Sequence, residues 1–127
     1  MIVVDTSALM TVLLREPKAG VCLDALEIED EIAISAGTLA ELFVVAAGRG
    51  ISGHAADLVE RAEIDVIAVT EGAARRVGEA YARWGKGIHP ANLNFGDCFA
   101  YALAKERGCP LLYVGDDFAK TDVKSAL

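Results

Sequence analysis

Short apolar segments alternate with segments of helical spacing along the whole chain, and this alternation restricts the fold more than any other feature. Buried strands are predicted at "MIVVD" (1–5), "EIAIS" (31–35), "EIDVIAV" (63–69) and "PLLYV" (110–114). Each of the first three strands is followed by a segment whose apolar residues recur at helical spacing. Strands that are separated by helices pair in parallel, with helices on both faces of the sheet. The sequence therefore predicts an α/β fold.

The predicted helices lie between these strands without a linker, an internal repeat or a low-complexity tract. Pro17 separates the first two, and glycines end several of the others. The helical segments are 6–16, 18–30, 38–50, 51–62, 70–87 and 94–108, and a tail follows at 118–127. This continuity predicts a single domain over residues 1–127.

The composition is that of a globular protein. The chain has 127 residues, of which 54% are hydrophobic, and this is enough to build one core. We expect no signal peptide, because the N-terminus lacks a basic start and a cleavage site, and no membrane span, because no apolar run approaches about 20 residues. Three cysteines without CxxC spacing favour neither a disulfide framework nor a zinc site. These features predict a cytoplasmic protein.

The charge balance limits the classes of partner. The net charge is −7 and the isoelectric point is about 4.7, which argues against binding to nucleic acid, since phosphates attract basic proteins. Two arrangements would reverse this conclusion: a cluster of acids that holds divalent cations, or a separate basic patch that faces the substrate. The same acidity also suits a basic protein partner.

Five acidic residues lie where a parallel sheet places its ligands. Asp5, Asp116 and Asp117 follow predicted strands, and Glu41 and Asp97 lie in the first turns of predicted helices. The carboxyl ends of parallel strands form the ligand crevice of such a sheet. Two carboxylates about 5 Å apart repel each other by roughly 3 kcal/mol at an effective dielectric constant near 20, so a cluster must take up protons or cations. Oxygen ligands alone indicate Mg²⁺ or Mn²⁺.

Each of these acids also has a purely structural interpretation. Asp5 can cap the N-terminus of the following helix, and Glu41 completes the capping-box pattern "TLAE". Asp97 can complement the dipole of its helix from the first turn. Asp116 and Asp117 suit a turn after the last strand. The pattern alone leaves both interpretations open.

Clustered acids with Mg²⁺ or Mn²⁺ commonly act on phosphate esters. The metal polarises a phosphoryl oxygen and lowers the pKa of a bound water. The chain has no phosphate-binding glycine loop and no second aspartate after "VVD", so a nucleotide-dependent kinase is not supported. A phosphate-accepting receiver-like domain would need two acids after the first strand and a lysine after the last. Here a single Asp5 follows the first strand, and Val114 and Gly115 follow the last.

The segments "MIVVDTSAL", "TLAE" and "GKGIHPANLNFGDCFAYALAKERGCPLLYVGDDFAKTDV" resemble the PIN-domain ribonucleases, and specifically the VapC toxins of VapBC toxin–antitoxin modules. The resemblance covers nearly the whole chain in order, and its central motif is long and specific. It implies a PIN-like three-layer α/β/α fold whose central parallel sheet has about four to five strands. It also implies an Mg²⁺- or Mn²⁺-dependent endoribonuclease that a cognate VapB antitoxin inhibits.

The resemblance assigns the acids by position. Asp5 matches the first family aspartate, Glu41 the glutamate, and Asp97 the aspartate of the "FGDC" segment. The family often has "KGNDFxxTD" where this chain has "VGDDFAKTD", so Asp117 aligns with the family aspartate and Asp116 replaces an asparagine. All five are candidate catalytic residues and metal ligands, and the choice between Asp116 and Asp117 as the fourth acid stays open.

The chain departs from the family where basic residues are common. Val114 replaces a lysine, and Ile88 stands where a basic residue often precedes the "HP" pair. The remaining candidates for RNA contact are Arg83, Trp84 and Lys86, which come just before this loop. Trp84 can stack on a base, or it can pack in the core.

Together these features predict a toxin that cleaves RNA with metal-activated water. Asp5, Asp97 and the Asp116–Asp117 pair would hold the metal, and Glu41 would bind a second metal or orient the water. The alternative is a catalytically silent PIN-like interaction module, which the intact acidic set argues against. The apolar segment "LFVVAAGRG" (42–50) favours a homodimer or antitoxin docking.

Overall fold

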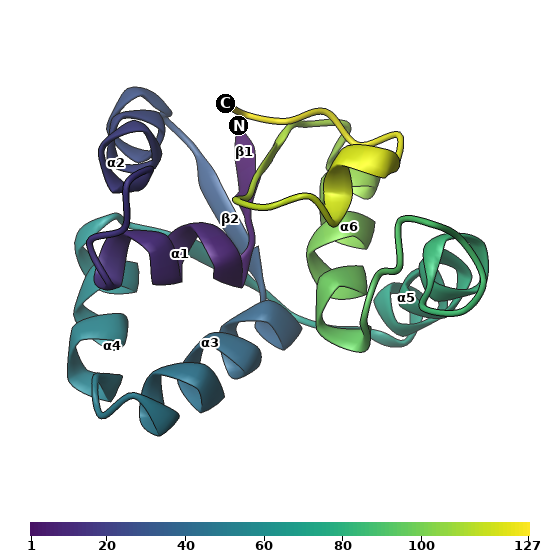
Figure 1. The fold of residues 1–127 in the computed structure, drawn as a ribbon, viewed down its shortest axis with the longest axis horizontal. Coiled ribbons are helices and arrows are strands. Elements are labelled where there is room, and N and C mark those ends of the chain that lie inside the picture. The colour runs from purple at the N-terminus through teal and green to yellow at the C-terminus, as the bar shows by residue number, and fades with distance from the viewer.

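The computed structural model describes all 127 residues and contains a four-stranded parallel sheet between two groups of helices (Figure 1). The strand order is β3-β2-β1-β4, and all three pairings are parallel. The strands are β1 (Ile2–Val4), β2 (Ile32–Ser35), β3 (Asp65–Ile67) and β4 (Leu111–Leu112). The predicted α/β class and the parallel sheet are confirmed, with four strands.

Six α-helices surround the sheet, and most of them begin at a residue whose side chain accepts a backbone N–H bond. These capping residues are Asp5, Ser35, Thr70 and Asn94. The helices are α1 (Thr6–Leu13), α2 (Ala19–Ile28), α3 (Ala36–Gly48), α4 (Ser52–Arg61), α5 (Glu71–Trp84) and α6 (Phe95–Arg107), and a 3₁₀ turn covers Phe118–Lys120. None of the helices is long and apolar enough to cross a membrane.

The alternation of side chains along the strands divides the interior into two cores. Ile2 and Val4 pack with residues of α1 to α4, whereas Val3, between them, packs with residues of α5 and α6. This follows from the strand geometry, in which successive side chains point to opposite faces. Both faces are covered, as Figure 1 shows, with α1 to α4 on one side and α5 and α6 on the other. The predicted three-layer architecture is therefore confirmed.

Two predicted strands are much shorter in the structure: β4 covers only Leu111–Leu112 of the expected 110–114, and the third strand also differs in burial. The segment 63–69 is expected to be a buried strand, but β3 covers only Asp65–Ile67 and lies at the edge of the sheet. Val66 is 48% exposed. The helical layers cover this edge of the sheet only in part, whereas they bury Leu111 and Leu112 of β4 at the opposite edge.

Helices α3 and α6 meet closely because glycines replace side chains at two contacts. The ring of Phe99 lies against Gly37, and the carboxylate of Glu41 lies against Gly96, with no room for a Cβ atom at either glycine. These contacts bring the N-terminal turn of α6 beside α3, at the edge of the sheet where β1 and β2 end.

The Gly37 contact predicts a sharp difference between two glycines of one helix. Gly37→Ala should lower the free energy of unfolding by about 1–2 kcal/mol, because the new methyl group displaces the Phe99 ring. Gly48→Ala, in the same helix but with nothing near its Cβ position, should leave stability unchanged or raise it by up to about 1 kcal/mol. Urea unfolding of the two variants checks this, and equal effects would contradict the close packing.

Candidate active site

Asp5 lies at the end of β1 and is 3% exposed. Its Oδ2 accepts the backbone N–H of Ser7 at 3.0 Å and the Ser7 hydroxyl at 2.7 Å, so it caps α1 as the structural interpretation predicts. Its Oδ1 is buried and has no hydrogen-bond partner. Desolvation, with a smaller contribution from the charge of Glu41, raises the pKa of Asp5 to about 6. A buried acceptor without a partner is costly, so this oxygen is available for a cation.

Ser7 is held from the other end of the chain. Its hydroxyl oxygen accepts the backbone N–H of Val114 at 3.0 Å, and its proton is therefore directed toward Asp5. The hydroxyl thus orients the carboxylate, and it joins Val114, two residues after the end of β4, to the start of α1. The sequence signal for this role is the polar pair "TS" that directly follows Asp5.

Asp97 lies in the first turn of α6 and is 7% exposed. Its Oδ2 accepts the backbone N–H of Asn94 at 3.0 Å, while the Asn94 side chain accepts the N–H of Asp97 at 2.8 Å, which makes a reciprocal capping box. Desolvation raises the pKa of Asp97 to about 7, with smaller contributions from the charges of Asp5, Asp117 and Glu41. Asp97 therefore caps its helix with one oxygen and belongs electrostatically to the acidic group.

Glu41 is half-buried, and its Oε1 accepts a hydrogen bond from the Thr6 hydroxyl at 2.7 Å. The capping box expected for "TLAE" is wrong, because α3 begins two residues earlier, at Ala36, with Ser35 as its cap. Thr38 consequently lies inside the helix, where its hydroxyl oxygen is buried without a partner. Glu41 is held by α1 instead of by its own helix end, and this places it among the other acids.

Asp116 and Asp117 follow β4 in the turn that precedes the 3₁₀ helix, and both are exposed. The charge of Asp117 contributes to the raised pKa of Asp97. Asp116 accepts the Ala119 N–H through its backbone carbonyl, as the turn interpretation predicts. Of the pair, Asp117 is the residue that is coupled to Asp97.

The arrangement fits a divalent cation in its donor chemistry. The coupled groups Asp5, Glu41, Asp97 and Asp117 offer only oxygen donors, which hard cations prefer. The buried, unpaired Oδ1 of Asp5 is the clearest free ligand. No three acidic, histidine or cysteine side chains have the geometry of a finished metal site in this structure, so the acids would have to adjust around an ion.

The suggestion that Trp84 stacks on a base does not fit the structure. Trp84 is only 8% exposed and packs in the core beside α6. Its indole N–H donates to the Tyr101 hydroxyl at 2.9 Å, and that hydroxyl donates to Asp122 at 2.6 Å. The core-packing alternative is the one observed, because burial satisfies both the ring and its N–H group.

The two basic candidates lie on the surface near the end of α5. The Arg83 guanidinium lies 4.5 Å from the centre of the Trp84 ring and pairs with Asp122 at 3.7 Å. Lys86 is exposed and forms no ion pair, and Ile88 is 55% exposed. Contact of Arg83 and Lys86 with RNA stays a prediction.

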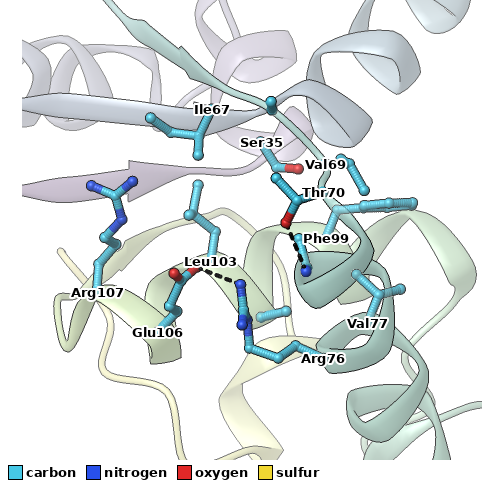
Figure 2. A pocket seen from close by; sticks show the side chains of 13 residues that line it. Ser35, Ile67, Val69, Thr70, Arg76, Val77, Phe99, Leu103, Glu106 and Arg107 are labelled. Atoms are coloured by element: carbon cyan, nitrogen blue, oxygen red, sulfur yellow. Dashed lines mark hydrogen bonds and ion pairs between the residues drawn. The ribbon is translucent and has the colours of Figure 1, made fainter.

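The structure also contains a pocket of about 210 Å³ between the end of β2, the segment after β3, α5 and α6 (Figure 2). Ile67, Phe99 and Leu103 line its apolar part, and Arg76 pairs with Glu106 at 3.2 Å beside them. None of the five candidate acids lines it. The pocket is therefore separate from the candidate active site.

Comparison with known proteins agrees with this architecture. The model of the PIN domain family matches residues 2–124. Ribonuclease VapC28 of Mycobacterium tuberculosis is 44% identical over 129 residues, which cover 98% of this chain and 97% of the relative. The chain belongs to the VapC family of PIN-domain proteins.

Solved structures share the fold of this PIN domain. VapC20 of M. tuberculosis, described as a sarcin–ricin loop cleaving toxin, aligns with a TM-score of 0.78 at 18% identity over 97% of this chain and 96% of that one. A toxin–antitoxin complex from Klebsiella pneumoniae gives a TM-score of 0.74 at 20% identity, covering 96% and 93%. At these identities the likeness shows the fold alone.

The raised pKa values predict how the stability of this PIN domain depends on pH. Without metal, the folded chain retains protons on Asp5 and Asp97 between their ordinary pKa of 3.8 and about 6 to 7, where the unfolded chain has lost them. The free energy of unfolding should therefore fall as pH rises through this window, by about 1.4 kcal/mol per pH unit for each retained proton. Urea unfolding in chelator measures the slope.

Two matched variants test whether Asp97 causes this pH dependence of the free energy of unfolding. Asp97→Asn keeps the oxygen that accepts the Asn94 N–H but cannot ionise, so it should reduce the slope and leave the metal-free protein at least as stable at neutral pH. Asp24→Asn, on the exposed face of α2, should keep the slope. A large loss of stability in Asp97→Asn would mean that the carboxylate is mainly a structural cap.

Proposed function

We propose that this protein is the ribonuclease toxin of a VapBC-type pair, and that it hydrolyses RNA phosphodiester bonds with Mg²⁺ or Mn²⁺. The observation that carries the proposal is the buried carboxylate of Asp5, whose Oδ1 has no partner at the edge where three other acids are electrostatically coupled. The relatives' name of ribonuclease supports the reaction class. A catalytically silent module would gain nothing from burying such groups together.

Each acidic residue of the site would have a separate role in the reaction. Asp5 and Asp97 would hold the cation, and Asp117 would add a further negative charge beside it. When bound, the cation supplies a Lewis acid and a water of lowered pKa. Glu41, fixed by the Thr6 hydroxyl, would orient the attacking water or hold a second cation. Ser7 would keep Asp5 turned so that one of its oxygens stays free.

The acidity of the chain also suits a protein inhibitor. An antitoxin that places an Arg or Lys among Asp5, Asp97 and Asp117 would form charge-assisted hydrogen bonds and exclude both RNA and cation. The Klebsiella toxin–antitoxin complex supports a partner of this kind. Phe43 and Val45 are exposed on α3 and offer apolar area for such a partner or for a homodimer.

The proposed reaction predicts metal-dependent cleavage. A total RNA pool incubated with the protein should be cut only when Mg²⁺ or Mn²⁺ is present. Asp97→Asn should reduce the rate by about a hundredfold or more, since it removes a proposed ligand of the cation, while Asp24→Asn should cut normally. Sequencing of the cut ends measures both. Cleavage that persists in chelator would contradict the metal mechanism.

If the antitoxin inserts a basic residue among the acids, the antitoxin and the metal ion should compete for the site. At constant ionic strength, the affinity of the antitoxin should fall as Mn²⁺ rises, because both bind the same carboxylates. Calorimetric titration of antitoxin into toxin over a range of Mn²⁺ concentrations measures this. Affinity that does not depend on Mn²⁺ would place the inhibitory contact elsewhere.

A further inference from the structure

A second hollow, of about 340 Å³, adjoins the acidic group between α3 and α6. Helix α3 contributes Ala40, Glu41 and Val44 to its lining, and α6 contributes Phe95, Gly96 and Phe99. Glu41 belongs both to this hollow and to the acidic group. The volume falls at the lower end of the roughly 300–1,000 Å³ that small-molecule pockets occupy.

Two phenylalanine rings make the lining of the hollow apolar and aromatic. The ring of Phe95 meets that of Phe99 edge to face, with centroids 5.0 Å apart and planes at 85°. Phe99 is anchored against Gly37, whereas Phe95 is 70% exposed. An aromatic ring that is left so open at the first residue of a helix has no role in the core, and it presents a flat apolar surface to a ligand.

Phe95 lies close to the acidic residues that are proposed to act on RNA. It directly precedes Gly96, against which the Glu41 carboxylate lies, and it comes two residues before Asp97. The hollow contains no basic side chain, and its single polar side chain is that of Glu41. Such a lining repels a phosphate but accepts the flat face of a base.

We propose that this hollow is a nucleobase subsite in which a base of the RNA stacks on Phe95, beside the carboxylates that act on the adjoining phosphate. The inference rests on the proposed ribonuclease function. Base stacking supplies binding that phosphate contacts cannot supply on a chain of net charge −7, and it makes Phe95 a residue that positions the substrate.

The test compares two inhibitors of total RNA cleavage by the complete protein in Mg²⁺. One is a short single-stranded DNA, and the other is an abasic strand with the same number of phosphates. The wild-type protein should be inhibited about tenfold more strongly by the strand that carries bases. Phe95→Ala should lose this discrimination and keep its melting temperature. Phe95→Trp should retain the discrimination, and so should Ile28→Ala, whose side chain is exposed at the end of α2 outside the hollow.

A spectroscopic measurement covers the case in which Phe95→Ala is inactive. The fluorescence of the Phe95→Trp protein should be quenched by the base-bearing strand and not by the abasic strand, while the buried Trp84 of the wild type should respond to neither.

Equal inhibition of the wild type by both strands, or unchanged discrimination in Phe95→Ala, would overturn the proposal. If Phe95→Ala keeps the discrimination but halves the molar mass in light scattering, the hollow is a protein interface. Failure of the wild type to cleave any RNA would instead overturn the proposed function.

Discussion

The burial of two carboxylates at the ends of helices is the constraint on which the rest of the site depends. Asp5 and Asp97 are each desolvated, and each uses Oδ2 to accept backbone N–H bonds at the start of a helix. These bonds fix the side chains and compensate part of the cost of burial. They involve one oxygen only, so the structural role and the proposed chemical role do not compete. Capping and the proposed metal binding would therefore use different oxygens of the same residues.

Much of the fold follows from the sequence because its signals are local. The alternation of strands and helices predicts the parallel sheet, and the "NFGD" pattern places the start of α6 at a capping residue. The coarse position of the acids also follows, since residues after parallel strands share one edge. Resemblance to the PIN family adds the order of the acids, and the structure adds how each one is held.

What sequence reasoning misses depends on contacts between distant segments. Glu41 suggests a capping box, but its partner is Thr6, which is 35 residues away. Trp84 suggests a stacking residue next to a basic pair, but Tyr101 receives its N–H in the core. The glycines at 37 and 96 give no sign in the sequence of the ring and the carboxylate that lie against them. Propensity and periodicity describe single elements, and none of these contacts lies within one.

The hydrogen bond from the Val114 backbone to Ser7 joins residues that are 107 positions apart, and β4 is a neighbour of β1 in the sheet. The orientation of the Asp5 carboxylate, which Ser7 fixes, thus depends on a segment that is far away in the sequence. A partly folded state in which β4 has not docked leaves an edge of β1 open and removes the Val114 donor from Ser7, so the final orientation of Asp5 requires the completed sheet.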